Sequence, residues 1–250
     1  MKTIALYNIK GGVGKTASAV NLSYRAAETG ARVLLWDLDP QGAASFYFRI
    51  KPKLKGGSSA LFRRKSAVND RIKGSDYEGL DILPADFSFR HLDLLFDKKI
   101  EPAKRVRRVI KPIRNDYDYL IIDCAPSISL VSESLFHAAD ALVVPTIPTP
   151  LSVRTLEQLV KFFRKERLDT SKIWPFFSMI DRRRRLHQNL ATELPLAKAG
   201  FLNSAIPYAS EVESMGVRRA PLLAYTHATA AAKAYEALWD EISGRLDTRK

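Results

Sequence analysis

Seven consecutive residues near the start of the sequence carry its clearest chemistry. They are Lys10, Gly11, Gly12, Val13, Gly14, Lys15 and Thr16. Glycines let consecutive backbone N–H groups turn inward around an anion, and a helix that begins directly afterwards adds the positive end of its dipole. In such a loop Lys15 would reach the β- and γ-phosphates of a nucleotide, and the Thr16 hydroxyl would bind Mg²⁺. The spacing therefore predicts a nucleotide phosphate site.

Two carboxylates, Asp37 and Asp39, follow an apolar run that begins at Val33. If this run is a strand of an open parallel sheet, both acids lie at the edge where such sheets bind ligands. Taken alone, acids before Pro40 and Gly42 often only form a turn. Beside a phosphate loop, they indicate metal and water chemistry.

Asp123 ends a third apolar run, residues 119–122, which is typical of a strand covered on both faces. We expect Asp123 to bind a water of the Mg²⁺ shell, because this small cation keeps several waters and takes few protein ligands. The alternative is an ordinary strand that ends in an acid.

The single cysteine, Cys124, follows directly and is expected to be a small core residue. One cysteine excludes disulfide frameworks and cysteine metal clusters within one chain.

Alternating strands and helices must position these groups. We expect strands within residues 4–9, 33–37, 79–84, 119–123, 141–144, 174–180 and 202–206. We expect helices near 17–28, 101–114, 152–165, 186–199 and 229–245. This alternation predicts an α/β fold with a mostly parallel twisted sheet flanked by helices on both faces. Nothing in the 250 residues resembles a linker, so we expect one domain over residues 1–250, in which the basic stretch from Lys51 to Gly74 is partly helical or mobile.

The sequence is strongly basic, with 40 Lys and Arg against 27 Asp and Glu, a formal net charge of +13. Such a charge makes polyanions natural partners. Basic residues gather in groups at 49–55, 63–65, 104–108, 161–167 and 182–185. Each group alone can be a solvated face, but together they favour nucleic acid. Non-specific binding of this kind needs no base-reading motif and should weaken steeply with salt.

The phosphate loop departs from its general pattern, because Ile9 stands where the first glycine is expected and Lys10 precedes the glycine pair. The form K-G-G-x-G-K-[ST] resembles the deviant Walker A motif of the ParA/MinD (Soj-like) family of P-loop ATPases. D-x-D-P-Q-G at residues 37–42 is similar to a second family motif, and residues 119–127 with 139–145 resemble its Walker B region. The resemblance covers nearly the full length, and it suggests a small ParA-type protein without an N-terminal helix-turn-helix domain.

This resemblance implies a role for each residue of the site. Asp37 and Asp123 would hold the Mg²⁺ shell with Thr16, and Asp39 would orient the attacking water. Lys10 would reach across an ATP-driven dimer to the partner's phosphates, so the implied catalytic residues are Lys10, Lys15 and Asp39. Ala17 departs from the family, which usually has a second hydroxyl there, although its backbone N–H is still available.

Two later segments resemble those that wrap the adenine base in the family. One contains Met179 and Asp181, and the other contains Ile206 and Pro207. Asp181 could equally cap a helix after its strand.

The resemblance also implies a Mg²⁺-dependent ATPase whose ATP-bound homodimer binds non-specific DNA in the cytoplasm, on the nucleoid. A ParB-like or cargo-adaptor protein would stimulate hydrolysis, and the cargo would be a plasmid, a chromosome, or a protein assembly such as carboxysomes or chemoreceptor clusters. The basic residue that relatives carry near residues 226–230 is missing here. We therefore expect the DNA contacts to come from Arg182, Arg183, Arg184, Arg185, Arg218 and Arg219.

Two alternatives stay open. A MinD-like protein would attach to membranes through an amphipathic C-terminal helix, but residues 237–242 are acidic as well as apolar, which favours core packing. No leader-like segment precedes the first strand, so we expect a cytosolic protein. The other alternative is a metabolic ATP-dependent synthetase of the same fold, which would turn over a small substrate without a protein activator.

Overall fold

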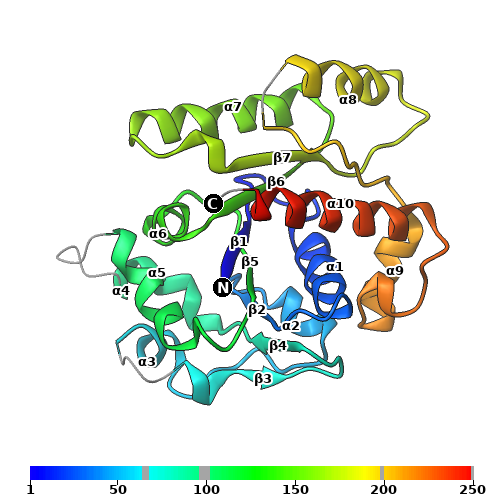
Figure 1. The fold of residues 1–250 in the computed structure, drawn as a ribbon. Helices are drawn as coiled ribbons and strands as arrows, with labels where there is room; N and C mark the ends of the chain where they lie inside the picture. The colour runs from blue at the N-terminus through cyan, green and yellow to red at the C-terminus, as the bar shows by residue number, and fades with distance from the viewer. Residues whose placement is uncertain (64–67, 96–101, 198–199, 249–250) are drawn as a thin grey trace.

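The computed structural model describes residues 1–63, 68–95, 102–197 and 200–248, and a seven-stranded sheet lies at its centre (Figure 1). The strands are β1 (Lys2–Leu6), β2 (Val33–Asp37), β3 (Lys73–Gly74), β4 (Leu80–Leu83), β5 (Tyr119–Asp123), β6 (Ala141–Thr146) and β7 (Ile173–Phe177). Their order is β3-β4-β2-β5-β1-β6-β7, and only the β3–β4 pair is antiparallel. The predicted α/β fold with a mostly parallel sheet is confirmed.

Helices cover both faces of this sheet (Figure 1). They are α1 (Lys15–Glu28), α2 (Ala43–Tyr47), α3 (Gly57–Arg63), α4 (Leu92–Leu95), α5 (Pro102–Ile110), α6 (Leu130–Ala138), α7 (Pro150–Lys165), α8 (Arg185–Ala197), α9 (Ser210–Arg218) and α10 (Ala230–Asp247). Short 3₁₀ turns occur at 69–71, 87–91, 111–113, 170–172 and 222–224. Alternate residues of the longer strands enter two separate cores. At β1, Ile4 and Leu6 face α1 and α10, whereas Ala5 and Tyr7, which directly follows the strand, face α5 to α7. Cys124 is buried in the second core, as predicted.

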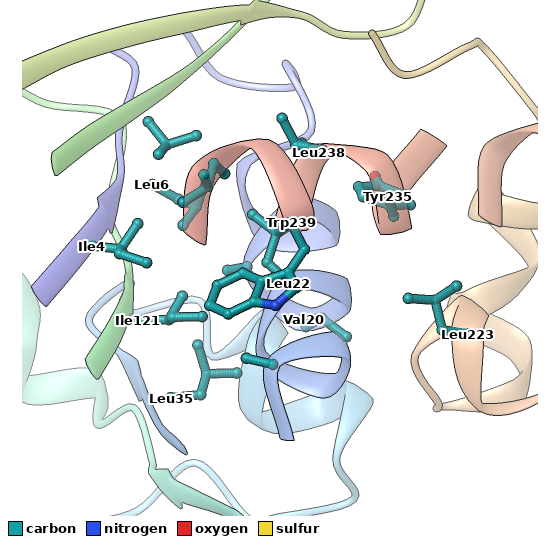
Figure 2. Packing of buried hydrophobic residues seen from close by; sticks show 14 of the residues in the cluster. Ile4, Leu6, Val20, Leu22, Leu35, Ile121, Leu223, Tyr235, Leu238 and Trp239 are labelled. Atoms are coloured by element: carbon teal, nitrogen blue, oxygen red, sulfur yellow. The ribbon is translucent and has the colours of Figure 1, made fainter. Parts of the chain in front are cut away.

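The apolar side of α10 is buried in the first core. Figure 2 shows Trp239, Leu238 and Tyr235 packed over α1 and the middle strands. The Trp239 ring meets Tyr119 of β5 edge to face, with the ring centroids 4.9 Å apart. This confirms that the last helix serves core packing. No helix in the described parts of the chain is long and apolar enough to cross a membrane.

Several expected elements differ from the structure. The strand predicted at 202–206 is wrong, because the N–H groups of Asn203 and Ser204 donate to a side chain of α10 instead of to a neighbouring strand. β7 ends at Phe177 rather than at residue 180, because Met179 adopts a left-handed conformation with φ 57°. β1 likewise ends before the phosphate loop, at Leu6.

Two further stretches were only partly predicted. The region 51–74 contains α3, a 3₁₀ turn at 69–71 and the short β3, whereas residues 64–67 lie outside the described residues. The helix expected at 101–114 is α5 followed by a 3₁₀ turn that includes Pro112, because proline cannot continue the α-helix; Glu101 is not described. The end of the helix expected at 186–199 also falls outside the description, at residues 198 and 199.

Candidate nucleotide site

The phosphate loop connects the carboxyl end of β1 to the start of α1, in the middle of the sheet. β1 pairs with β5 on one side and β6 on the other, so the loop lies between their ends. Gly12 and Gly14 have φ of 68° and 89°, which only glycine adopts at little cost. A Cβ at Gly11 or Gly12 would meet no atom within 4 Å, so these backbone groups are open to a ligand.

Two side chains that the motif does not include hold this loop. Asn8 accepts from Lys10 N at 2.8 Å and donates to Pro145 O at 2.8 Å. Ser178 Oγ donates to Val13 O at 2.8 Å, and both residues are buried. The loop is therefore attached to the ends of β6 and β7, and Ser178 lies so close to Gly14 that a Cβ there would come within 2.9 Å of its hydroxyl.

The two lysines of the loop are placed differently. Lys15 is 7% exposed, and its Nζ donates to Lys10 O at 3.1 Å. Burial lowers the pKa of Lys15, and the negative charge of Asp123 opposes this shift. Lys10 is half-buried, and its Nζ lies 3.4 Å from the hydroxyl of Ser152 in the first turn of α7. Thr16 and Ala17 follow in the first turn of α1, both half-buried.

The structure brings two of the predicted acids together. Asp37 and Asp123 are register partners at the ends of β2 and β5, and both are fully buried. Asp37 Oδ2 accepts from the backbone N and the hydroxyl of Ser45, at 2.7 Å each. Asp37 Oδ1 and both oxygens of Asp123 accept no hydrogen bond of good geometry among the described residues, although the Thr16 hydroxyl lies near enough to Asp123 to lower its pKa slightly against the effect of burial.

This arrangement is unfavourable for two negative charges. Burial raises the pKa of Asp37 to about 6. It raises the pKa of Asp123 well above its ordinary value, and the neighbouring Asp37 adds to the shift. A bound cation would reverse both effects, because it supplies the missing partner and the opposite charge.

The donor set fits Mg²⁺. Within the described residues no group of three or more His, Cys, Asp or Glu side chains is placed to hold a metal ion alone. Three unpartnered oxygens of Asp37 and Asp123 beside Thr16 and the phosphate loop match an ion that takes few protein ligands and completes its shell with phosphate oxygens and water. Asp39 lies two residues beyond Asp37, half-buried, and its Oδ1 accepts from Gln41 N at 2.9 Å.

The two predicted adenine segments lie side by side. Ile180 N donates to Ile206 O at 3.0 Å, Tyr208 N donates to Ile180 O at 3.0 Å, and Ile180 forms a parallel bridge with Pro207. Met179 directly precedes this bridge, and its positive φ is a strained conformation for a side chain of its kind. The structure therefore brings Met179, the neighbour of Ile180, near Ile206 and Pro207 in space.

Asp181 is engaged in a turn before α8. Its carboxylate binds the Arg183 guanidinium through two contacts of 3.0 and 3.1 Å and lies 3.5 Å from Arg184 Nε. The hydrogen bonds from Arg183 hold the pKa of Asp181 down, at about 2. Its Oδ1 also accepts from Arg183 N at 3.0 Å, so its carboxylate serves the local turn; contact with a base stays a prediction.

The basic residues proposed for DNA form two groups. Arg182, Arg183, Arg184 and Arg185 are exposed at the start of α8. Arg218 ends α9, and Arg219 follows it with φ 49°. The Arg218 guanidinium lies over the Tyr225 ring at 4.6 Å, and that of Arg219 lies over the Phe46 ring of α2 at 4.5 Å. The second group therefore adjoins the helix that follows the D-x-D-P-Q-G loop.

Sequence comparison identifies relatives over most of the chain. Residues 1–173 match a family described as an AAA domain. The chain is 30% identical over 266 residues to the chromosome partitioning protein ParA of Caulobacter vibrioides, which covers 100% of this chain and 97% of that protein. It is 35% identical over 164 residues to the sporulation initiation inhibitor protein Soj of Bacillus subtilis, which covers 65% of each.

Structure comparison agrees in fold. A putative plasmid partition protein from Borrelia burgdorferi, solved with AMPPNP bound, superposes with a TM-score of 0.83. The match covers 98% of this chain and 99% of that one, at 22% identity, which supports a shared fold.

Proposed function

Because this chain belongs to the ParA/MinD family of P-loop ATPases, we propose that it hydrolyses Mg²⁺-bound ATP within a dimer that forms when ATP binds. One observation carries the proposal. A phosphate loop that contains Lys10 adjoins two fully buried carboxylates, Asp37 and Asp123, three of whose oxygens have no partner in the described structure. A buried pair of this kind is costly unless a cation joins it.

The chain's own residues would divide the chemistry as follows. The open backbone of Gly11 and Gly12 binds the phosphates, and Lys15 neutralises the β- and γ-phosphates from its buried position. Thr16, Asp37 and Asp123 hold the metal and its waters. A bound Mg²⁺ would supply charge that offsets the phosphate oxygens during transfer.

Asp39 would orient the attacking water. It follows the metal-binding Asp37 by two residues, and its hydrogen bond to Gln41 N holds the carboxylate in the loop. Orientation of the nucleophile is one of the main tasks in phosphoryl transfer, because most of the catalysis is positioning and electrostatics.

Lys10 would make hydrolysis depend on the dimer. In the single chain its ammonium group lies against Ser152 of its own α7, at a contact of 3.4 Å that is long for a strong hydrogen bond. In the dimer Lys10 would leave Ser152 and reach the partner's phosphates, as an arginine finger does. The monomer would then hydrolyse ATP slowly.

The dimer would bind non-specific DNA and act in the cytoplasm, on the nucleoid. The net charge of +13, the exposed residues 182–185 and Arg218, and the half-buried Arg219 support this step. A ParB-like or cargo-adaptor protein would stimulate hydrolysis and release the dimer. The name of the Caulobacter relative, a chromosome partitioning protein, favours DNA as the cargo over a protein assembly.

The experiment is co-sedimentation with non-specific duplex DNA and, separately, with anionic liposomes. Wild type, Asp39→Ala and Lys15→Ala are compared with ATP, ADP or no nucleotide across a salt series. We expect salt-sensitive DNA binding that needs ATP, persists in Asp39→Ala and is absent in Lys15→Ala. Liposome binding alone would support a MinD-like protein instead, and binding to neither would favour a metabolic synthetase.

A further inference from the structure

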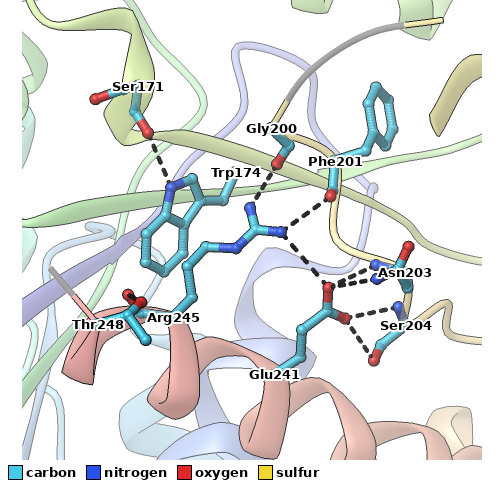
Figure 3. A network of polar contacts seen from close by, with 9 residues as sticks. All are labelled: Ser171, Trp174, Gly200, Phe201, Asn203, Ser204, Glu241, Arg245 and Thr248. Carbon is cyan, nitrogen blue, oxygen red and sulfur yellow. Dashed lines mark hydrogen bonds and ion pairs between the residues drawn. The ribbon is translucent and has the colours of Figure 1, made fainter. Parts of the chain in front are cut away.

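Residues 203 and 204, which precede the second predicted adenine segment at Ile206 and Pro207, are held by the last helix, α10. Glu241 of α10 accepts from Asn203 N at 2.8 Å and from Ser204 N at 2.9 Å (Figure 3). The side chains of the same two residues donate to it as well, at 3.3 and 2.9 Å. Both oxygens of one carboxylate thus bind two consecutive residues.

Arg245, one turn further along α10, completes this contact. Its guanidinium donates to Gly200 O at 3.0 Å and to Phe201 O at 3.2 Å, and lies 3.6 Å from Glu241 Oε1. It also lies over the Trp174 ring of β7, 5.2 Å from the ring centroid. We call Glu241 and Arg245 the α10 clamp; it holds residues 200, 201, 203 and 204 from one side (Figure 3).

The clamp binds backbone N–H groups that form no hydrogen bond to the sheet. Leu202 N donates to Pro175 O and Ile206 N donates to Phe177 O, at 2.8 Å each. Between these two bonds the backbone N–H groups of Asn203 and Ser204 face Glu241 rather than β7. Glu241 thus accepts from two N–H groups that make no bond to β7, and it holds the chain at Ser204, two residues before Ile206.

The next residues are those that would contact the base. Ile206 and Pro207 follow Ser204 by two and three positions, and Ile206 O accepts from Ile180 N. On its other side this pair is tied to the phosphate loop, because Met179 separates Ile180 from Ser178, which binds Val13 O. The base segment is therefore fixed at one end by the phosphate loop and at the other by α10.

We infer that Glu241 is a positioning residue for the nucleotide base, which acts through residues 203–207 and does not touch the phosphates. The inference rests on the proposed function, since it assumes that Ile206 and Pro207 contact adenine. It predicts that loss of the clamp weakens recognition of the base and leaves recognition of the phosphates unchanged.

The test is Glu241→Gln in the full chain. The amide has the same shape, but its NH₂ group must face the N–H donor of either Asn203 or Ser204, so one backbone donor loses its partner. The matched control is Asp240→Asn, which removes one negative charge from an exposed position of the same helix. Calorimetric titration with two probes, Mg²⁺-AMPPNP and Mg²⁺-tripolyphosphate, separates binding of the base and ribose from binding of the phosphates.

We expect wild type and Asp240→Asn to bind AMPPNP more tightly than tripolyphosphate. Glu241→Gln should bind AMPPNP roughly tenfold more weakly, with tripolyphosphate affinity changed by less than about twofold. If this variant does not fold, Ser204→Ala removes one of the four donors and should show the same selective loss at about twofold to threefold.

Each other result overturns the inference. An equal loss for both probes would make the clamp a general support of the fold, and no loss for either would make it irrelevant to binding. If wild type binds both probes equally, the base contributes nothing to binding and the inference is wrong, whereas the phosphate site of the proposed function is still supported. Wild type that binds neither probe would contradict the proposed function.

Discussion

Replacing Asp37 by asparagine should change how the stability of the nucleotide-free protein depends on pH. Asp37 is fully buried, and burial raises its pKa from an ordinary 3.8 to about 6. The folded protein therefore holds this proton where the unfolded chain has released it. The contribution of Asp37 to the free energy of unfolding therefore falls as the pH rises from 3.8 through about 6, by on the order of a few kcal/mol, and the raised pKa of Asp123 extends the fall to higher pH.

The neutral amide of Asp37→Asn does not titrate, so the part of this loss that comes from Asp37 should disappear. A share of it on the order of 1 kcal/mol falls between pH 5 and pH 8, where urea unfolding can be measured. Over this range the variant should gain that much stability relative to wild type, or about 2–4 °C in melting temperature. Asp240→Asn, an exposed acid, is the control and should show no such gain.

The same variant tests the metal. In wild type Mg²⁺ and ATP together should stabilise the protein more than ATP alone, and most of this difference should be lost in Asp37→Asn. Parallel pH profiles for Asp37→Asn and wild type would refute the reasoning, because Asp37 would then ionise in the folded protein as easily as in water.

Three further predictions concern the loop and the basic surface. Gly14→Ala should weaken ATP binding at least tenfold, because left-handed backbone costs about 1–2 kcal/mol for a residue with a Cβ and this Cβ would lie 2.9 Å from a serine hydroxyl. The control is Gly216→Ala in α9, where a Cβ meets open space away from the loop, and it should bind within about twofold of wild type by the same titration. Lys10→Ala should keep ATP affinity but lose on the order of 10³-fold in partner-stimulated phosphate release, and an unchanged rate would exclude Lys10 from the transition state. Replacement of Arg218 and Arg219 by Glu should weaken DNA binding and reduce the slope of log affinity against log salt by about 2, and an unchanged slope would remove both from the DNA surface.

The phosphate loop and the acids could be predicted because their signals are local. Glycines, a lysine pair and a hydroxyl residue occur together at residues 10–16, and Asp37 and Asp123 each end a continuous apolar run. The parallel sheet then brings the two acids to the same edge, as the register of β2 and β5 shows.

The supporting contacts could not be predicted, because they join distant parts of the chain. Ser178 binds Val13 across 165 positions, although its place just after an apolar run at the ligand edge was a usable signal. Asn8, at the end of the first apolar run, offers a similar signal, whereas Ser45 has none. The strand at 202–206 was wrongly predicted for the same reason. Its apolar pattern is local, but the acceptor of the Asn203 N–H group is Glu241, which comes 38 residues later in the chain. α9 was missed because only Met215 in it is fully buried, which leaves a weak apolar stripe.

The most direct test of ATP-driven dimer formation is the mass of the Asp39→Ala protein in sedimentation velocity, with ATP, with ADP and with no nucleotide. In the proposed cycle ATP on the phosphate loop brings two chains together, and Lys10 of each chain contacts the phosphates of the other. We predict a dimer with ATP, a monomer with ADP or without nucleotide, and a monomer with ATP when Lys10→Ala is added. A monomer in all conditions, or the same dimer in all of them, would show that ATP does not drive dimer formation.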